Sequence, residues 1–278
     1  MKKYIWGFAA TAALAAAIAA PASAHRQWMM PSATVLSGDD VWVTVDAAIS
    51  NDLFYFEHHP MRLDAMKAWA PDGSEAAIEN KATGRYRSTF DVHLTQKGTW
   101  RIASLSDGVM GSYDLNGKTE RLPRGTTSAN LAERIPAGAT NVRTAESNNR
   151  NEIFVTVGEP TTTLFQPTGK GIELVPVTHP NDLIAGETAT FQFLLDGKPA
   201  AGLPVTVIPG GIRYRDQLGQ MDLQTGADGK VEVNWTAPGL YWLNVTTPRA
   251  AREEGEGAAP AAPQRRASYV TTLEVLAP

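Results

Sequence analysis

Short runs of alternating apolar and polar residues, broken by Gly, Pro, Asp and Asn, recur along the chain after its first 24 residues. The stretch "DDVWVTVDAAI" alternates around Val41, Val43 and Val45. Because successive side chains of a strand point to opposite faces, this period of two is typical of a β-strand with one buried face. Within "TGADGKVEVNW" an Asp-Gly turn separates two such runs, which predicts a hairpin. Only residues 127–135, "TSANLAERI", are predicted to form a short helix, so we expect an all-β protein.

The strand pattern falls into two halves. The alternation is interrupted at "GEPTTTLFQPTGKG", a stretch rich in Pro, Gly and Thr, and resumes at "GIELVPV". We therefore predict two tandem Ig-like β-sandwich domains, residues 25–158 and 171–278, joined by a linker at 159–170. Residues 248–268 are rich in Ala, Pro, Glu and Arg and cannot bury a core. They are expected to form a disordered loop inside the final hairpin, whose last strand is "YVTTLEVL".

Residues 1–24 are predicted to be a cleaved secretory signal peptide. Lys2 and Lys3 precede a long uncharged apolar run that ends in the small residues "PASA". We prefer cleavage after Ala24, which makes His25 the first residue of the mature chain. Cleavage after Ala22 stays open and would leave His25 in third place. No other segment approaches membrane-spanning length, so we expect a soluble periplasmic protein without stable membrane insertion.

Composition excludes several classes of function. The chain has no cysteine, which rules out disulfides, thiolate catalysis and thiolate metal sites. Its net charge of −4 and the lack of a basic patch with interleaved aromatics argue against binding to nucleic acid. Phosphate-cradling glycine loops, zinc-protease helices and nucleophile elbows are also missing from the sequence. The chain is therefore predicted not to be an enzyme.

Histidine is the residue type that points to chemistry, and four of the five histidines lie in the first half. After cleavage at Ala24, His25 offers both its α-amine and a ring nitrogen to one ion. A further imidazole would complete the three-nitrogen arrangement called a histidine brace. All-nitrogen sites of this kind favour Cu(II) or Ni(II). Cleavage after Ala22 would instead leave an amino-terminal copper- and nickel-binding tripeptide motif. Trp28 and Pro31 follow closely, and we expect them to anchor the terminus on the sandwich.

His58 and His59 stand in "NDLFYFEHHPM". On an extended strand their side chains point to opposite faces, so they share an ion only if the backbone turns near Pro60. Phe54 and Phe56 have the parity of His58 and would face the core, which places His58 beside a dry wall. We therefore favour His58 over His59 as a ligand. An exposed histidine pair in a loop is the alternative.

His93 is the next candidate ligand. Alternation places Asp91 on the same face, where a carboxylate orients a metal-bound imidazole, although His93 equally fits a solvated strand position. His179 precedes a proline at a turn and is interpreted as structural or incidental. The predicted metal ligands are thus His25, His58 and His93, with His59 as a further candidate. Scattered methionines are more often core residues than ligands, and they leave copper open as the metal.

The residues discussed so far carry a family resemblance. The opening "AHRQWMMPS" followed by "VLSGDDVWVTVDA", and later "GIELVPVTHPNDLIAGETATFQFLLDGKPAAGLPVTVIPGG" with "ADGKVEVNWTAPGLYWLNV", resemble the DUF4198 family. Its members are exported bacterial proteins often described as periplasmic components of cobalt or nickel uptake. The resemblance covers nearly all of the mature chain, and it implies handling of transition metals outside the cytoplasm.

The sequence thus predicts a periplasmic metal-binding protein. It would capture Ni(II) or Co(II), or copper, through the N-terminal histidine and other imidazoles. The resemblance implies a membrane metal importer or an outer-membrane receptor as its partner. Two other functions stay open: a non-catalytic Ig-like interaction or adhesion module, and a copper oxidase built on a histidine brace.

Overall fold

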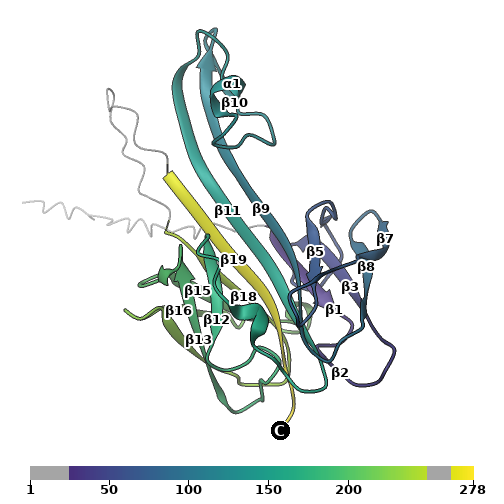
Figure 1. Cartoon of the computed structure of the whole chain (residues 1–278). Coiled ribbons are helices and arrows are strands. Elements are labelled where there is room, and N and C mark those ends of the chain that lie inside the picture. The colour runs from purple at the N-terminus through teal and green to yellow at the C-terminus, as the bar shows by residue number, and fades with distance from the viewer. Residues whose placement is uncertain (1–24, 249–263) are drawn as a thin grey trace, which may run out of the picture.

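The computed structural model describes residues 25–248 and 264–278 (Figure 1). Nearly all secondary structure in these residues is β-strand, with one short helix, α1 (Leu131–Arg134), and two 3₁₀ turns, η1 (Thr163–Phe165) and η2 (Ile212–Tyr214). No helix in the described ranges has the length and apolar character needed to cross a membrane. The predicted signal peptide, residues 1–24, lies outside the described residues.

The strands form three sheets. The first has the order β1-β3-β8-β7, with β4 beside β3. Its strands are β1 (Arg26–Pro31), β3 (Val41–Ser50), β4 (His59–Pro60), β7 (Glu79–Thr83) and β8 (Ser88–Leu94). The third sheet has the order β12-β13-β14, with β17 beside β13. Its strands are β12 (Ile172–Pro176), β13 (Thr188–Leu195), β14 (Lys198–Pro199) and β17 (Lys230–Asn234).

The second sheet runs through both halves of the chain. Its order is β16-β15-β18-β19-β11-β9-β5-β6, with β10 beside β9 and β2 beside β11. Its strands in chain order are β2 (Val35–Leu36), β5 (Met66–Trp69), β6 (Glu75–Ala76), β9 (Gly98–Leu115), β10 (Lys118–Arg121), β11 (Thr140–Val157), β15 (Pro204–Pro209), β16 (Met221–Gln224), β18 (Gly239–Thr246) and β19 (Gln264–Val275). The two halves join where β11 and β19 pair in parallel, from Ala145↔Gln264 to Glu152↔Thr271.

Each outer sheet packs on one part of this shared sheet, so the prediction of an all-β fold with two Ig-like sandwiches is confirmed. In the first sandwich, Val43, Phe90 and Trp100 are buried between the first sheet and β5, β9 and β11. In the second, Phe193 and Trp235 are buried between the third sheet and β15, β18 and β19. The alternating burial of β3 and β8 is the period of two that the sequence displays.

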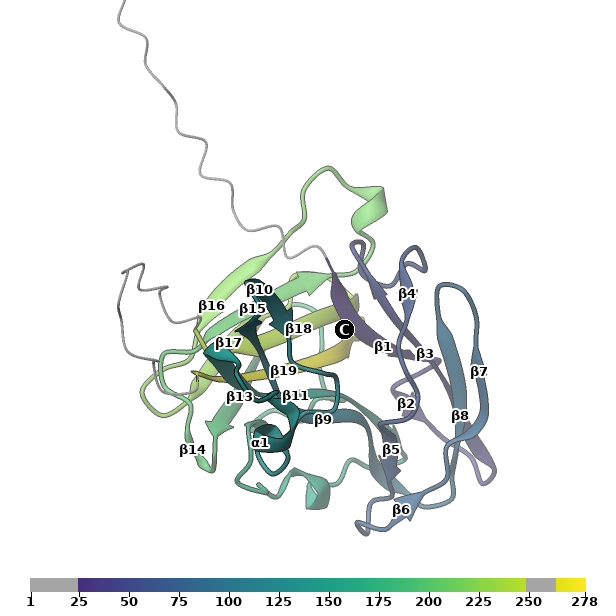
Figure 2. The ribbon, with the colours of Figure 1, turned by 90° about the horizontal axis from the view of Figure 1, so that it is seen from above.

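A third, smaller apolar cluster lies where the two sandwiches meet. Its buried members come from both halves of the chain: Trp28, Ala48, Leu53, Ile208, Trp242 and Val270. The Nε1–H of Trp242 donates a hydrogen bond to the carbonyl oxygen of Gln27, at 3.0 Å. Viewed from above, the loop between β15 and β16 lies on the same side of the molecule as the start of β1 (Figure 2). This junction cluster supports the candidate site described below.

Three local expectations need correction or refinement. Strand β19 begins at Gln264, so residues 264–268 belong to the sheet and not to the predicted loop 248–268; the rest of that prediction, residues 249–263, lies outside the described residues. The helix predicted over 127–135 is confined to Leu131–Arg134. The predicted linker 159–170 is packed against the fold, because η1 buries Leu164 and Phe165.

His179 lies at the junction of the two halves. Its Nε2 is 3.0 Å from the Thr99 hydroxyl, and its Nδ1 accepts the backbone N–H of Asn181 at 3.1 Å. The ring of Phe165 packs edge-on against it, at 5.5 Å between centroids. Burial lowers the pKa of His179. These contacts give His179 a structural role and leave it no free ring nitrogen for a metal.

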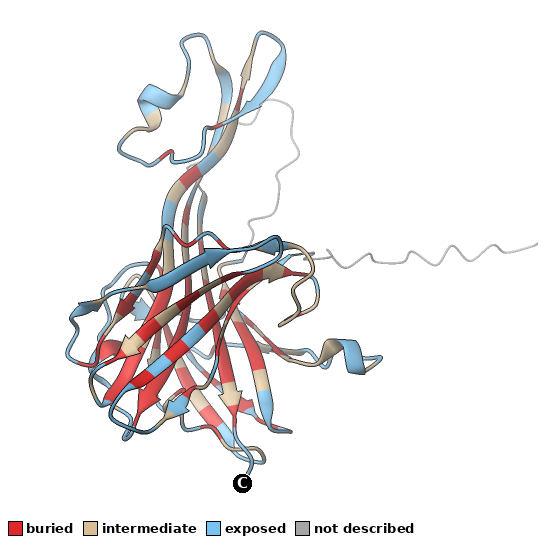
Figure 3. Cartoon of the chain, turned by 90° about the vertical axis from the view of Figure 1, so that its right-hand side faces the viewer, coloured by how far each residue is buried: buried red, intermediate tan, exposed pale blue. Residues whose placement is uncertain are grey.

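The long strands β9 and β11 continue beyond the sandwiches as a projecting arm (Figures 1 and 3). The arm carries β10, α1 and a small apolar cluster of its own around Val109, Tyr113 and Leu122. Figure 3 shows that most of its remaining surface is exposed. The arm is therefore a separate feature from the sandwich cores.

Candidate metal-binding site

Strand β1 fixes the position of His25. β1 pairs antiparallel with β3, with Arg26 opposite Ser50. Trp28 is fully buried, and its Nε1–H donates to the Ser50 hydroxyl at 2.8 Å. The expectation that Trp28 anchors this end of the chain is therefore confirmed. His25, the residue before β1, is exposed beside the end of β3.

The segment after β3 is a folded loop and not the extended strand that the sequence suggested. The N–H of Tyr55 donates to the carbonyl oxygen of Asp52 at 3.3 Å, and Phe54 has a φ of 63°. The Glu57 carboxylate accepts the backbone N–H groups of Asn51 and Asp52, each at 2.9 Å. The loop is therefore closed by its own side chain, and the parity argument does not apply to it.

The phenylalanines of this loop pack against Trp28 of β1. Phe54 and Phe56 lie 5.4 and 5.5 Å from Trp28, measured between ring centroids. The guanidinium of Arg87 lies over the ring of Phe56, 4.4 Å from its centroid. Phe54 and Phe56 therefore pack against the junction cluster, although a loop directs them there instead of a strand.

The loop and β1 bring three imidazoles together, which we call the histidine cluster: His25, His58 and His59. The rings of His25 and His58 are stacked, with 4.0 Å between centroids and 11° between planes. The rings of His58 and His59 lie 4.1 Å apart at 50°. The backbone turn that neighbouring histidines need in order to meet is thus present.

The cluster is not arranged as a finished metal site. Within residues 25–248 and 264–278, no group of three or more His, Asp or Glu side chains is positioned to hold an ion. Stacked rings direct their nitrogens along parallel planes, whereas ligands of one ion direct them to a common point. Nitrogens that share an ion at 2.0–2.1 Å lie roughly 3 Å from each other. The rings of His25 and His59 each lie about 4 Å from that of His58, so sharing one ion would require the rings to rotate out of their present arrangement.

The cluster also has an electrostatic signature. The pKa of His58 is lowered, first by its partial removal from water and then by the neighbouring rings of His25 and His59. Glu57 acts in the opposite direction, but its carboxylate is engaged by the loop backbone. His58 therefore favours the neutral form, which is the form that binds metal.

The structure does not bring His93 into the cluster. His93 stands opposite Trp42 on β3, whereas His59 stands opposite Ile49. Seven residues of strand separate these positions, about 23 Å at 3.3 Å per residue. His93 instead stacks on Trp42, at 4.3 Å and 2°, and its Nε2 is 2.8 Å from Asp40. The prediction that it shares an ion with His25 and His58 is therefore wrong.

The carboxylate that pairs with His93 also differs from the expected one. Asp91 accepts hydrogen bonds from Thr44 at 2.6 Å and Asn80 at 2.8 Å, which lower its pKa. Asp40 takes its place, since the loop before β3 brings it to the end of β8. Met29 and Met61 are not free to bind an ion, because both are buried in the first core, and Met30 packs partly buried against the junction cluster.

Fold and site together define the class of protein: a two-sandwich, all-β chain with an exposed imidazole cluster at the start of its first strand. The sequence matches a family over residues 22–249, and this match covers most of the chain. The chain belongs to that family, described as "Domain of unknown function (DUF4198)". No curated protein matches the sequence.

Solved structures give distant similarities. Trypsin-activated alpha-2-macroglobulin from Escherichia coli is 13% identical with a TM-score of 0.23, and the match covers 91% of this chain but only 16% of that one. The D0–D1 domain of intimin is 10% identical with a TM-score of 0.21, covering 89% and 97% of the two chains. Two tandem V-type regions of a v-region-containing chitin-binding protein are 9% identical with a TM-score of 0.18, covering 90% and 99%. The assignment of two sandwiches rests on the sheet topology of the chain itself.

Proposed function

We propose that this protein is a non-enzymatic carrier of a first-row transition metal outside the cytoplasm. It captures Ni(II) or Co(II), with copper as the alternative, and delivers the ion to a membrane uptake system. The observation that supports this proposal best is the approach of three imidazoles to 4.0 and 4.1 Å on an exposed surface. Imidazole is a preferred ligand of these metals.

The terminal amine is the fourth nitrogen of the proposal. Cleavage of the chain after Ala24 would free the α-amine of His25, which forms a chelate ring with the imidazole of the same residue. Because β1 holds Arg26 opposite Ser50, this amine would lie beside His58 and not on a loose tail. The site would then have nitrogen donors throughout, as favoured by Ni(II) and Cu(II).

The experiment compares two forms of the mature protein by calorimetric titration with NiCl₂. One form begins at His25, and the other retains Ala24 and so has its amine one residue away. We expect the extended form to bind at least about tenfold more weakly, equivalent to about 1.4 kcal/mol. Equal affinity would contradict the role of the amine. The mass of the chain purified from the periplasm tests the cleavage site itself.

Affinity should also depend on pH. Ligands bind in their deprotonated forms, and a terminal amine has an ordinary pKa of about 7.7–8.0. Protons therefore compete with the metal increasingly as pH falls below about 7, and affinity decreases. Titrations in buffers of different ionisation enthalpy measure the protons released per ion bound. Binding without proton release would contradict the proposed ligands.

The projecting arm supports a second candidate, a non-catalytic interaction module. β9 and β11 are each 18 residues long, and their outer ends extend past both sandwiches (Figure 1). Such an arm contributes nothing to the sandwich cores, which makes a binding role reasonable. Metal analysis after exhaustive dialysis separates the candidates. Retention of one Ni(II) per chain supports the carrier, and complete loss supports the interaction module.

A further inference from the structure

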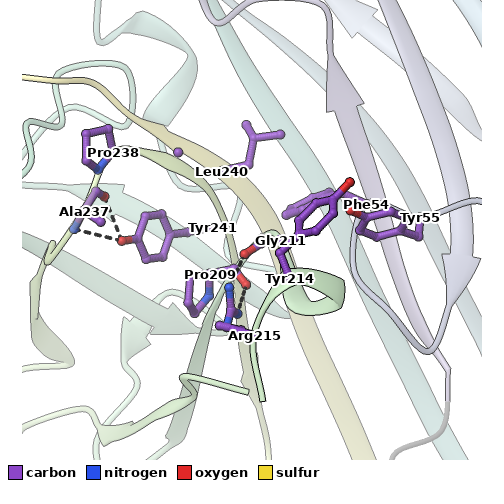
Figure 4. Close-up of a pocket in the computed structure, with 12 residues that line it drawn as sticks. Phe54, Tyr55, Pro209, Gly211, Tyr214, Arg215, Ala237, Pro238, Leu240 and Tyr241 are labelled. Atoms are coloured by element: carbon purple, nitrogen blue, oxygen red, sulfur yellow. Dashed lines mark hydrogen bonds between the residues drawn. The ribbon is translucent and has the colours of Figure 1, made fainter. Parts of the chain in front are cut away.

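A cleft of 520 Å³ separates the loop after β3 from two loops of the second sandwich (Figure 4). This volume is typical of sites for small molecules. None of the three clustered histidines lines it. Its walls are mainly aromatic or apolar, and the residues that matter here are Phe54, Tyr55, Tyr214, Arg215, Leu240 and Tyr241.

The loop between β15 and β16 is held rigidly on one side of the cleft. The Arg215 guanidinium donates hydrogen bonds to four carbonyl oxygens of this loop. Three of them are at Pro209 (2.5 Å), Leu218 (2.7 Å) and Gln217 (2.8 Å), and the fourth is at Gly210. Because all four hydrogen bonds of its guanidinium go to backbone carbonyls of the loop, Arg215 orders the loop and is not available to a ligand. Such prior order reduces the entropy lost on binding.

The opposite wall fits this loop closely. A Cβ on Gly210 would lie 2.9 Å from Cδ2 of Phe54, so only glycine allows this approach. Despite the tight fit, Tyr214 is 84% exposed at the tip of the ordered loop. Its ring lies 6.2 Å from that of Tyr55, at 64°. The mouth of the cleft therefore presents the exposed ring of Tyr214 beside the partly exposed ring of Tyr55.

A second guanidinium, that of Arg213, is not itself part of the cleft lining but lies against one of the lining residues. Arg213 stacks over the ring of Tyr55, 4.6 Å from its centroid. It forms an ion pair with Asp52, 3.7 Å from Nε to Oδ2, a distance too long for a hydrogen bond. In the described part of the chain, no group accepts a hydrogen bond from Arg213. Its fork of N–H groups can therefore bind an incoming carboxylate with two bonds.

We propose that this cleft binds a small organic anion that carries a ring, of the class of aromatic carboxylates. The ring packs against Tyr55 and Tyr214, and the carboxylate pairs with Arg213. A cationic ligand is disfavoured by the two guanidinium groups, and a neutral ligand leaves the donors of Arg213 unused. The proposal does not depend on metal binding, because the cleft uses no histidine.

The test uses the whole mature protein, stripped of metal with EDTA, and saturation-transfer NMR with benzoate. Benzamide is the neutral probe of the same shape, and glucose represents sugars. We expect saturable binding of benzoate that is about tenfold tighter than that of benzamide, since a charged bidentate pair is the stronger contact. Arg213→Gln should reduce benzoate binding to the level of benzamide. Tyr214→Ala should weaken both.

The chain offers a matched control. Arg85 stacks over Tyr86 at 5.5 Å, so the same pair of residue types is exposed away from the cleft. Arg85→Gln and Tyr86→Ala should leave benzoate binding unchanged. The proposal is overturned if benzoate does not saturate, if Arg213→Gln binds it normally, or if glucose binds more tightly. Because metal is absent throughout, none of these results bears on the carrier function.

Discussion

The two ends of strand β3 each carry histidine stacked on another ring, but the two arrangements differ in what completes them. At one end, His93 lies on Trp42 and pairs with the Asp40 carboxylate at 2.8 Å. At the other end, His25 and His58 lie on each other, with His59 beside them. The first arrangement satisfies the imidazole with protein groups alone. The second gathers like groups that repel each other once protonated.

This difference bears on which end of β3 would carry the proposed metal site. Partial removal from water and the neighbouring rings of His25 and His59 lower the pKa of His58, which favours its neutral, metal-binding form. Contacts between neutral imidazoles on a surface contribute little to stability in water. A metal ion shared between the three rings would stabilise the histidine cluster. The comparison therefore favours the histidine cluster over His93 as the place of the metal binding proposed above.

The largest expected effect concerns the two tryptophans of these ends. Trp28→Ala should destabilise the fold by about 3–5 kcal/mol, because the side chain is fully buried, so that its loss leaves a cavity and removes the hydrogen bond to the Ser50 hydroxyl. Trp42→Ala, at 40% exposure, should cost less than about 1 kcal/mol. Urea unfolding followed by circular dichroism measures both. Equal losses would show that the ends of β3 are not distinguished by burial.

Removing imidazoles should lower the affinity for metal at one end of β3 and leave it unchanged at the other. The double variant His58→Ala/His59→Ala should bind Ni(II) roughly 100-fold more weakly, or about 2.8 kcal/mol. His93→Ala should bind as the natural protein does, because His93 pairs with Trp42, about 23 Å of strand from Ile49, the partner of His59. Calorimetric titration with NiCl₂ gives both values. If His93→Ala weakens binding as strongly as the double variant, the assignment of the site to the cluster is wrong.

The loop that carries His58 can be disturbed without touching a ligand. Gly210→Ala places a Cβ 2.9 Å from Phe54 and 3.1 Å from the carbonyl oxygen of Leu240. We expect a loss of about 1–3 kcal/mol in unfolding free energy, because backbone cannot yield as a flexible side chain does. Gly84→Ala is the control, since its nearest atom is 3.4 Å away. Thermal unfolding measures both variants, and equal stability would show that the two loops do not fit as tightly as described.

The sequence predicts the strands well because their information is local. The alternation around Val43 and in "RSTFDVHL" is the burial pattern of β3 and β8. The shared sheet was not predicted, because the parallel pairing of Ala145 with Gln264 joins segments that carry no mutual signal. For the same reason nothing in the sequence indicated the cleft, in which Tyr55 and Tyr214 come together from positions 159 residues apart.

The site was predicted only in part. The role of Trp28 follows from a large apolar residue close to an expected chain end. The loop 51–58 could not be predicted, because the alternation of Phe54 and Phe56 resembles that of a strand. The hydrogen bond from the Asn51 backbone to Glu57, which closes the loop, has no signal in the sequence. Parity also placed His93 correctly on the polar face of β8. It could not tell at which end of β3 that residue lies.

The smallest expected effect is a change in the titration of His58. Burial and the rings of His25 and His59 lower its pKa, so His25→Ala should move the pKa of His58 upward. In the folded chain the neutral ring is favoured, and its contribution to stability is therefore complete above about 6.5, the ordinary pKa of histidine, and is lost as pH falls below that value. NMR titration of the ring proton signals in metal-free protein measures the shift. Asp40→Asn, at the far end of β3, is the matched control and should leave His58 unchanged. A pKa of His58 that does not respond to His25→Ala would mean that the two rings are not in contact in solution, and the cluster would then lack the arrangement that distinguishes it from His93.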